Sequence, residues 1–136
     1  MTVSAPAKRG AARRAAVPAP RAPRIELICV GTELLSGQVN THQSYISLQL
    51  RAAGLELSRE SSLPDDEKKL AQAVAEALSR SDAVILSGGL GPTFDDLTRE
   101  AVASALGRPL CFHPELWKAI VKKFARYSIP VPEENK

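Results

Sequence analysis

The sequence predicts an α/β fold with a parallel sheet and crossover helices, and three observations point to this class. Short apolar runs rich in β-branched residues cover residues 25–31 and 83–87, which is the pattern of buried strands. Segments with helical spacing of apolar residues follow the predicted strands. Strands and helices alternate along the chain, and this order is typical of parallel strands joined by crossover helices.

The first half of the predicted domain begins with the strand over residues 25–31, which ends at a glycine. Residues 32–39 are expected to form a loop. Asn40 or Thr41 then provides a suitable cap for a helix that ends at Gly54, because a residue without Cβ suits the position after a helix.

The second half repeats this alternation. Alternating residues predict a second strand over residues 55–63, and the acidic segment 64–67 suits the positive end of the next helix dipole. A third strand is predicted over residues 83–87. Two more helices are expected over residues 97–106 and 114–127.

Charge divides the chain into a tail and one domain. Residues 1–24 are rich in Ala, Pro and Arg and contain six basic residues and no acid, whereas residues 25–136 contain 12 basic and 15 acidic residues. Arg-rich, acid-poor starts also occur in mitochondrial transit peptides, but the prolines and the shortage of Ser favour a disordered tail. The basic pI therefore belongs to the tail, and we do not expect a nucleic-acid partner.

Composition excludes several other classes of protein. Of the 136 residues, 44% are hydrophobic and 24% are charged, which is an ordinary globular composition, and no apolar run is long enough for a membrane span. Aromatic residues make up only 4%, so stacking platforms for bases are scarce. Cys29 and Cys111 form no metal-ligand spacing, and a buried reduced Cys29 is compatible with the cytoplasm.

The glycine-rich segment after the third strand is the most informative candidate site. Ligands of open parallel sheets bind beyond the carboxyl ends of the strands. Gly88, Gly89 and Gly91 allow the backbone to approach a ligand closely, and free N–H groups there would bind a phosphate. A tight strand-to-helix turn without a ligand is the alternative interpretation.

Acidic residues follow each of the three predicted strands. Asp95 and Asp96 beside a phosphate site indicate a divalent cation such as Mg²⁺, which bridges carboxylate and phosphate oxygens, although Asp95 could instead cap the next helix. Glu33 and Asp65 reach the same edge and could hold a metal or orient a water, although Asp65 could also be a helix cap. Neutral donors in the first loop, which an ordinary polar loop would equally explain, are Thr32, Ser36 and Asn40.

Three motifs resemble those of a known family. Segments 31–41 (GTELLSGQVNT), 63–66 (LPDD) and 87–101 (SGGLGPTFDDLTREA) are similar to the molybdopterin-binding (MoaB/Mog-like) domain. Within this family they look most like the N-terminal domain of the competence/damage-inducible CinA branch. The resemblance implies a three-layer fold and a pterin phosphate or nucleotide held by the glycine-rich loop. It also implies roles for Asp65 and Asp96 in adenylyl transfer or molybdate insertion.

The CinA branch is associated with metal-dependent hydrolysis of the pyrophosphate bond of ADP-ribose, so the resemblance implies this activity for the complete domain. The alternatives are a molybdopterin-binding enzyme of molybdenum cofactor biosynthesis and a truncated, non-catalytic module completed by a partner. The resemblance covers residues 25–136 and leaves no room for the deamidase domain that many CinA-type proteins carry. It also makes a homo-oligomer plausible.

The candidate residues can be grouped by expected role. The expected catalytic residues are Asp65, Asp96 and Glu33, and the expected metal ligands are Asp95 and Asp96. The expected phosphate- or nucleotide-binding residues are Gly88, Gly89, Gly91, Thr93, Ser36, Gly37 and Asn40. Neither histidine has a Ser or Cys partner in its sequence context, so a catalytic histidine is not expected.

Overall fold

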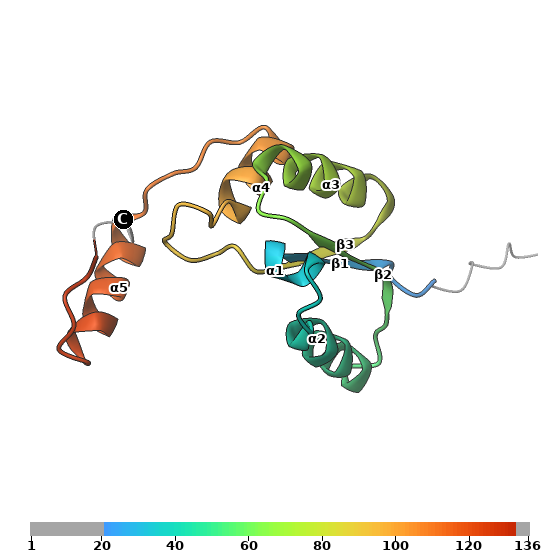
Figure 1. Cartoon of the computed structure of the whole chain (residues 1–136), viewed down its shortest axis with the longest axis horizontal. Helices are drawn as coiled ribbons and strands as arrows, with labels where there is room; N and C mark the ends of the chain where they lie inside the picture. Colours follow the sequence, from blue (N-terminus) through green and yellow to red (C-terminus); the bar gives the residue numbers. More distant parts are fainter. Residues whose placement is uncertain (1–20, 133–136) are drawn as a thin grey trace, which may run out of the picture.

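The computed structural model describes residues 21–132 and contains a three-stranded parallel sheet (Figure 1). Strand β1 (Ile25–Val30) lies in the middle, between β2 (Leu57–Leu63) and β3 (Ala83–Ser87). Both neighbours run parallel to β1. The carboxyl ends of all three strands therefore lie at one edge of the sheet, as the alternation of strands and helices predicted.

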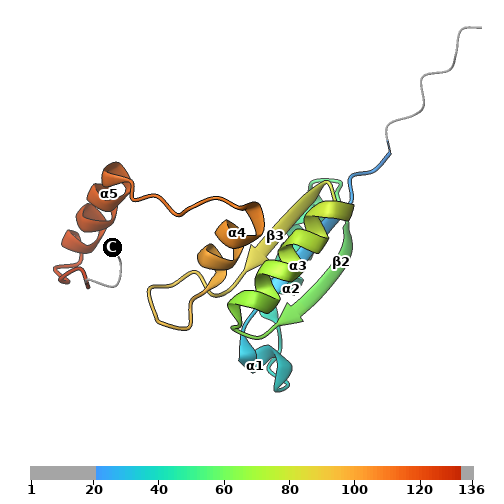
Figure 2. The same ribbon diagram turned by 90° about the horizontal axis from the view of Figure 1, so that it is seen from above.

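Helices cover both faces of this sheet. The described helices are α1 (Thr32–Leu35), α2 (Thr41–Ala52), α3 (Glu67–Arg80), α4 (Thr98–Leu106) and α5 (Pro114–Ala125). Helices α3 and α4 lie on one face and α2 on the other (Figure 1). Helix α5 stands apart from the sheet at the end of the extended segment that follows α4 (Figure 2). The result is the predicted arrangement of helix, sheet and helix layers.

The core forms because β1 is buried along its whole length. Ile28 and Val30 pack against α3 and α4, in a cluster with Leu70, Val74, Ala77 and Ala101. Side chains alternate between the two faces of a strand, so Leu27 and Cys29 point to the face that carries α2. Both are at most 1% exposed, which confirms the predicted buried thiol.

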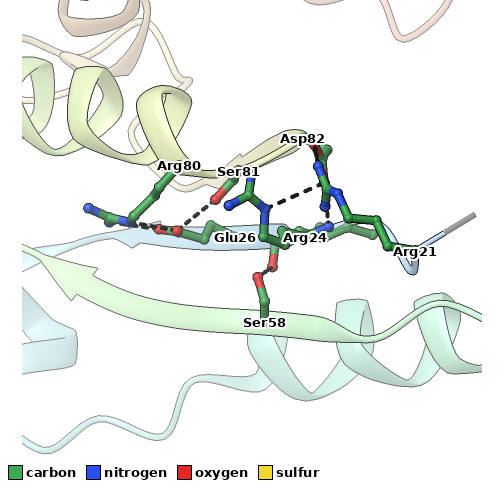
Figure 3. Close-up of polar contacts among 8 residues, drawn as sticks. Arg21, Arg24, Glu26, Ser58, Arg80, Ser81 and Asp82 are labelled. Carbon is green, nitrogen blue, oxygen red and sulfur yellow. Dashed lines mark hydrogen bonds and ion pairs between the residues drawn. The ribbon is translucent and has the colours of Figure 1, made fainter. Parts of the chain in front are cut away.

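A buried acid joins β1 to α3 at the end of the sheet opposite the strand carboxyl ends (Figure 3). Glu26 is 4% exposed and accepts two hydrogen bonds from the Arg80 guanidinium, at 2.7 and 2.8 Å. The Ser81 hydroxyl donates a third, at 2.6 Å. The contact with Arg80 is the main cause that lowers the pKa of Glu26 to about 2.

Asp82 anchors the segment that leads into β1. Its carboxylate accepts two hydrogen bonds of 2.7 Å from the Arg21 guanidinium and one of 2.8 Å from the Arg24 N–H (Figure 3). These contacts hold the pKa of Asp82 well below its usual range. Arg21 and Arg24 belong to the segment predicted as a disordered tail, whose residues 1–20 lie outside the described residues.

Local details differ from the sequence-based expectations in three places. Residues 32–39, predicted as a loop, include the single helical turn α1, and β2 begins at Leu57 rather than at residue 55. Helix α4 has Leu97 at its N-cap with no side-chain hydrogen bond, so the alternative of Asp95 as a helix cap is wrong. Asn40 does cap α2, accepting a hydrogen bond from the Gln43 N–H. No helix within residues 21–132 has the length and apolar character needed to cross a membrane.

Candidate functional site at the carboxyl ends of the strands

The ends of the three strands meet closely. The Gly31 N–H, directly after β1, donates to the Leu63 carbonyl at the end of β2, at 3.0 Å. Gly88, directly after β3, lies against the Val30 carbonyl, so that a Cβ at this position would overlap that oxygen. The loops that follow the three strands therefore start from one small region of the molecule.

The glycine-rich loop after β3 has a backbone that few other residues would tolerate. Gly88 and Gly89 have φ angles of +102° and +59°. The buried Thr98 at the start of α4 fixes the loop, since its hydroxyl donates to the Gly88 carbonyl at 2.8 Å and its N–H to the Gly89 carbonyl at 3.1 Å. No described residue accepts a hydrogen bond from the N–H of Gly89 or Leu90, so these groups are free to bind an anion.

Asp65 lies against the end of β1, at the shared edge of the sheet where the sequence predicted it. One of its carboxylate oxygens accepts hydrogen bonds of 2.9 Å from both the N–H and the hydroxyl of Thr32. The capping of α3 is performed by the next residue, Asp66, which accepts from the Lys69 N–H at 3.1 Å. The structure thus rejects the alternative in which Asp65 is the cap.

Glu33 reaches the same region from α1. Its carboxylate lies over Gly31, at the place where a Cβ on that glycine would stand. The residue is exposed and belongs to the first turn of the helix, where an acid suits the dipole. Gln38 and Ser36 bend back over this turn, because the Gln38 and Ser36 N–H groups both donate to the Glu33 carbonyl.

Asp96 has a different environment from Asp65. It braces its own loop, because one carboxylate oxygen accepts hydrogen bonds from the N–H and the hydroxyl of Thr93. These bonds, together with one from the Gly91 N–H and the charge of Arg99, lower the pKa of Asp96. Thr93 and Gly91, predicted as ligand-binding residues, are therefore engaged in holding the loop.

The carboxylates do not form a ready-made metal centre. Within residues 21–132, no group of three or more His, Cys, Asp or Glu side chains is placed to hold a metal ion. Asp65 and Asp96 each commit one oxygen to neighbouring donors, and Asp95 is exposed. A magnesium ion at this edge would need most of its ligands from phosphate oxygens and water, which is its usual manner of binding to phosphate-containing substrates.

Sequence reasoning missed one pair of polar residues at this edge. His42, at the start of α2, has its Nδ1 atom 3.0 Å from the Ser87 hydroxyl at the end of β3. The two residues lie 45 positions apart, so no local pattern could reveal the contact. They line a pocket of about 130 Å³ together with Asn40, Glu33 and Gly88.

A larger cavity of about 480 Å³ lies between α4 and residues 108–110. Its lining is mainly apolar and includes no acid, so it offers no group for hydrolytic chemistry. The polar pocket beside Gly88 and the glycine-rich loop together make the better candidate for a functional site. The predicted Gly37, at φ +96°, has open space around it and touches neither feature.

Comparison with known proteins identifies the family. Residues 26–132 match the family model described as "Probable molybdopterin binding domain". The chain belongs to this molybdopterin-binding domain family. The resemblance to the MoaB/Mog-like domain and its CinA branch, which was predicted from the three motifs after the strands, is thereby confirmed.

Relatives of this domain include proteins that carry the name "Putative competence-damage inducible protein". The one from Caldicellulosiruptor saccharolyticus is 45% identical over 112 residues, which are 82% of this chain and 27% of that protein. The one from Bacillus subtilis is 41% identical over 114 residues, which are 83% of this chain and 27% of that protein. The chain thus spans about a quarter of the length of these relatives.

Solved structures show the same fold. The protein CinA from Thermoplasma acidophilum, described as having unknown function, superposes with a TM-score of 0.74 at 36% identity, over 83% of this chain and 66% of that one. The tungsten cofactor synthesizing protein MoaB from Pyrococcus furiosus has a TM-score of 0.56 at 24% identity, over 81% of this chain and 69% of that one. The latter likeness concerns the fold alone.

Proposed function

We propose that this molybdopterin-binding-type domain binds a nucleotide such as ADP-ribose and hydrolyses its pyrophosphate bond with the help of a divalent metal. The observation that carries the proposal is the glycine-rich loop, whose free N–H groups at Gly89 and Leu90 suit phosphate oxygens. The similarity to CinA-type proteins, through the three motifs, supports ADP-ribose as the substrate.

The proposed reaction consumes one water molecule. The water oxygen forms a bond to one phosphorus atom while the bridging P–O bond breaks, and the products are AMP and ribose 5-phosphate. The loop N–H groups donate hydrogen bonds to the phosphate oxygens, and such donors stabilise charge that develops during the reaction. A metal bound with the pyrophosphate would neutralise further negative charge, and Asp95 is the exposed carboxylate beside the loop that could contact it.

Asp65 is the first candidate for the group that accepts the proton of the water. Its Oδ2 is fixed by the N–H and hydroxyl of Thr32, which sets the direction of the remaining oxygen. A general base of this kind contributes roughly 10²- to 10⁴-fold to a rate. Glu33 is the second candidate for this role, because its carboxylate lies over Gly31 at the same edge.

The test is release of AMP from ADP-ribose, measured by chromatography with Mg²⁺ or Mn²⁺ and with chelator. We expect Asp65→Asn to lower the rate at least 100-fold while ADP-ribose still binds. The matched control is Asp66→Asn, since Asn caps a helix as well as Asp does and the activity should persist. Absence of AMP with every metal would refute hydrolysis by this chain, and equal rates for wild type and Asp65→Asn would refute the role of Asp65.

The family description favours a second candidate ligand, molybdopterin. The phosphate of this pterin would occupy the same loop N–H groups, so the loop alone does not discriminate between the two ligands. Competition between molybdopterin and ADP-ribose for the purified domain separates them. Tight molybdopterin binding without turnover of ADP-ribose would favour a place in molybdenum cofactor biosynthesis.

A further inference from the structure

The small polar pocket beside the glycine-rich loop has a lining suited to a sugar. It is built by the segment from α1 to the start of α2 and by the ends of β1 and β3, and its volume is about 130 Å³. Drug-sized ligands need several hundred Å³, so a pocket of this size takes one ring rather than a whole nucleotide.

Strand geometry places Ser87 in this pocket. Val84 and Leu86 of β3 pack against the core between the sheet and α3, so Ser87 points to the opposite face, where α2 lies. Ser87 pairs in register with Cys29 on β1. His42, in the first turn of α2, therefore meets the Ser87 hydroxyl across the pocket, with 3.0 Å between Nδ1 and Oγ.

The charge of the lining argues against a phosphate inside the pocket. Glu33 carries a negative charge, and the lining contains no Lys or Arg. Burial, the largest of its causes, raises the pKa of the Cys29 thiol, so this group stays neutral. The remaining polar lining consists of hydroxyl, amide and imidazole groups, from Gln38, Asn40, Thr41, His42 and Ser87. A carboxylate with neutral donors and acceptors is suited to the hydroxyl groups of a sugar.

One unpaired group supports a polar ligand. The side-chain N–H₂ of Asn40 is buried, and among the described residues it faces only the weakly accepting Cys29 sulfur, without normal hydrogen-bond geometry. Its Oδ1 atom is engaged by the Gln43 N–H, which fixes the orientation of the amide. A ligand oxygen or a water in the pocket would be a stronger acceptor for this buried donor than the sulfur is.

Gly88 belongs to the lining of the pocket and also to the glycine-rich loop. A phosphate on the loop N–H groups would therefore have its attached sugar beside the pocket. We propose that the pocket is a ribose subsite, in which His42 orients the Ser87 hydroxyl toward a ribose hydroxyl of the bound nucleotide. This inference rests on the proposed function, because it assumes that the loop holds the phosphate of a nucleotide.

Ser87 is the contacting residue in this arrangement, and His42 is a positioning residue. Either tautomer of His42 can hold the hydroxyl: Nδ1 accepts the Ser87 proton in one, and donates to the Ser87 oxygen in the other. Two substitutions of His42 test which of its two ring nitrogens makes the contact with Ser87. In His42→Asn the terminal amide stands near the place of Nδ1, whereas in His42→Gln it stands near the place of Nε2.

The experiment compares the dissociation constants of ribose 5-phosphate, 2-deoxyribose 5-phosphate and inorganic pyrophosphate, measured by calorimetry on the full chain. For wild type we expect ribose 5-phosphate to bind more tightly than the deoxy sugar. We expect Ser87→Ala and His42→Gln each to raise the dissociation constant of ribose 5-phosphate by roughly three- to tenfold, which corresponds to the loss of one hydrogen bond. Pyrophosphate, which uses only the loop, should bind equally to all variants, and His42→Asn should restore the affinity for ribose 5-phosphate.

Coupling provides a second readout. The double variant His42→Gln with Ser87→Ala should bind ribose 5-phosphate no more weakly than Ser87→Ala alone, because both changes remove the same contact. Circular dichroism and thermal unfolding confirm that each variant is folded before it is titrated.

Three outcomes would overturn the subsite. They are no binding of ribose 5-phosphate by wild type, equal affinity for the two sugars, and an equal loss of affinity for sugar phosphate and pyrophosphate in the variants. Failure of the proposed function has a different signature. If ribose 5-phosphate binds as expected but no AMP is released from ADP-ribose, the subsite stands and hydrolysis is refuted.

Discussion

The buried acid at the far end of the sheet allows a quantitative test of the fold. Replacing Glu26 by Gln keeps the size of the side chain and the acceptor for Ser81, but removes the charge that two guanidinium nitrogens of Arg80 contact at 2.7 and 2.8 Å. Glu26 is 4% exposed, so water screens the charge poorly. We therefore expect Glu26→Gln to destabilise the protein at neutral pH.

The magnitude follows from the pKa of Glu26, which falls from an ordinary 4.5 to about 2 in the folded state. A difference of this size corresponds to about 3 kcal/mol, at about 1.4 kcal/mol for each pH unit. The Arg80 side chain is 38% exposed, and solvent screening reduces the expected loss to roughly 2 kcal/mol. Because the folded-state pKa is lowered, this stabilisation is complete above about pH 4.5 and disappears as the pH falls through about 2.

The assay is urea unfolding followed by circular dichroism at pH 7, 5, 4 and 3. The difference between wild type and Glu26→Gln should be constant at pH 7 and 5 and should shrink at pH 4 and 3. Glu76→Gln is the matched control, because Glu76 contacts the same Arg80 at 3.8 Å but its side chain is 54% exposed. An exposed pair of this kind is worth about 0.5 kcal/mol or less.

Two results would refute this reasoning. Equal stability of wild type and Glu26→Gln at pH 7 would mean that the buried pair contributes nothing to folding. A difference that stays the same from pH 7 to pH 3 would mean that the loss comes from packing rather than from the charge. Nucleotide binding should not change, since Glu26 lies at the opposite end of β1 from the glycine-rich loop.

Three further changes test the glycine-rich loop and the cap of α3, each by urea unfolding. Gly88→Ala should lower the free energy of unfolding by roughly 2 kcal/mol or more, because of the positive φ and the overlap with the Val30 carbonyl. Gly37→Ala, which also has a positive φ but has open space, should lower it by about 1 kcal/mol. Equal losses would contradict the close approach at Gly88. Thr98→Val should lower the free energy of unfolding by about 1–3 kcal/mol, since it leaves the Gly88 carbonyl without its 2.8 Å donor. It should also weaken phosphate binding. Unchanged stability would show that water replaces the hydroxyl. Asp66→Ala should cost about 1 kcal/mol through the lost cap, and no loss would contradict the assignment of Asp66 as the cap of α3.

The strands, the cap of α2 and the glycine-rich loop could be predicted from the sequence, because they depend on local chemistry. The apolar run at residues 25–30 matches a strand that is buried on both faces. Asn40 caps α2 because its short side chain reaches the nearby Gln43 N–H. Glycines after β3 were recognisable because positive φ angles and close approach to backbone exclude most other residues.

Only the tertiary structure decides which of the neighbouring acids Asp65 and Asp66 caps α3. Asp65 and Asp66 are both carboxylates beside a helix start, and either could have been the cap. Asp66 caps α3, while Asp65 turns to Thr32, 33 residues away in the sequence. Only the parallel pairing of β1 with β2 brings Thr32 to Asp65, so this contact was beyond sequence reasoning.

The sequence by itself determined which segments form the three strands and helices α2 to α5, where the glycine-rich loop lies and to which family the chain belongs. The tertiary structure alone decided that Glu26 pairs with Arg80 and that His42 meets Ser87, over separations of 54 and 45 residues. The physical reason is that apolar runs, glycine turns and a cap such as Asn40 depend on the few residues beside them. Contacts between distant side chains depend on the register of the strands and on the face of the sheet to which each crossover helix is directed.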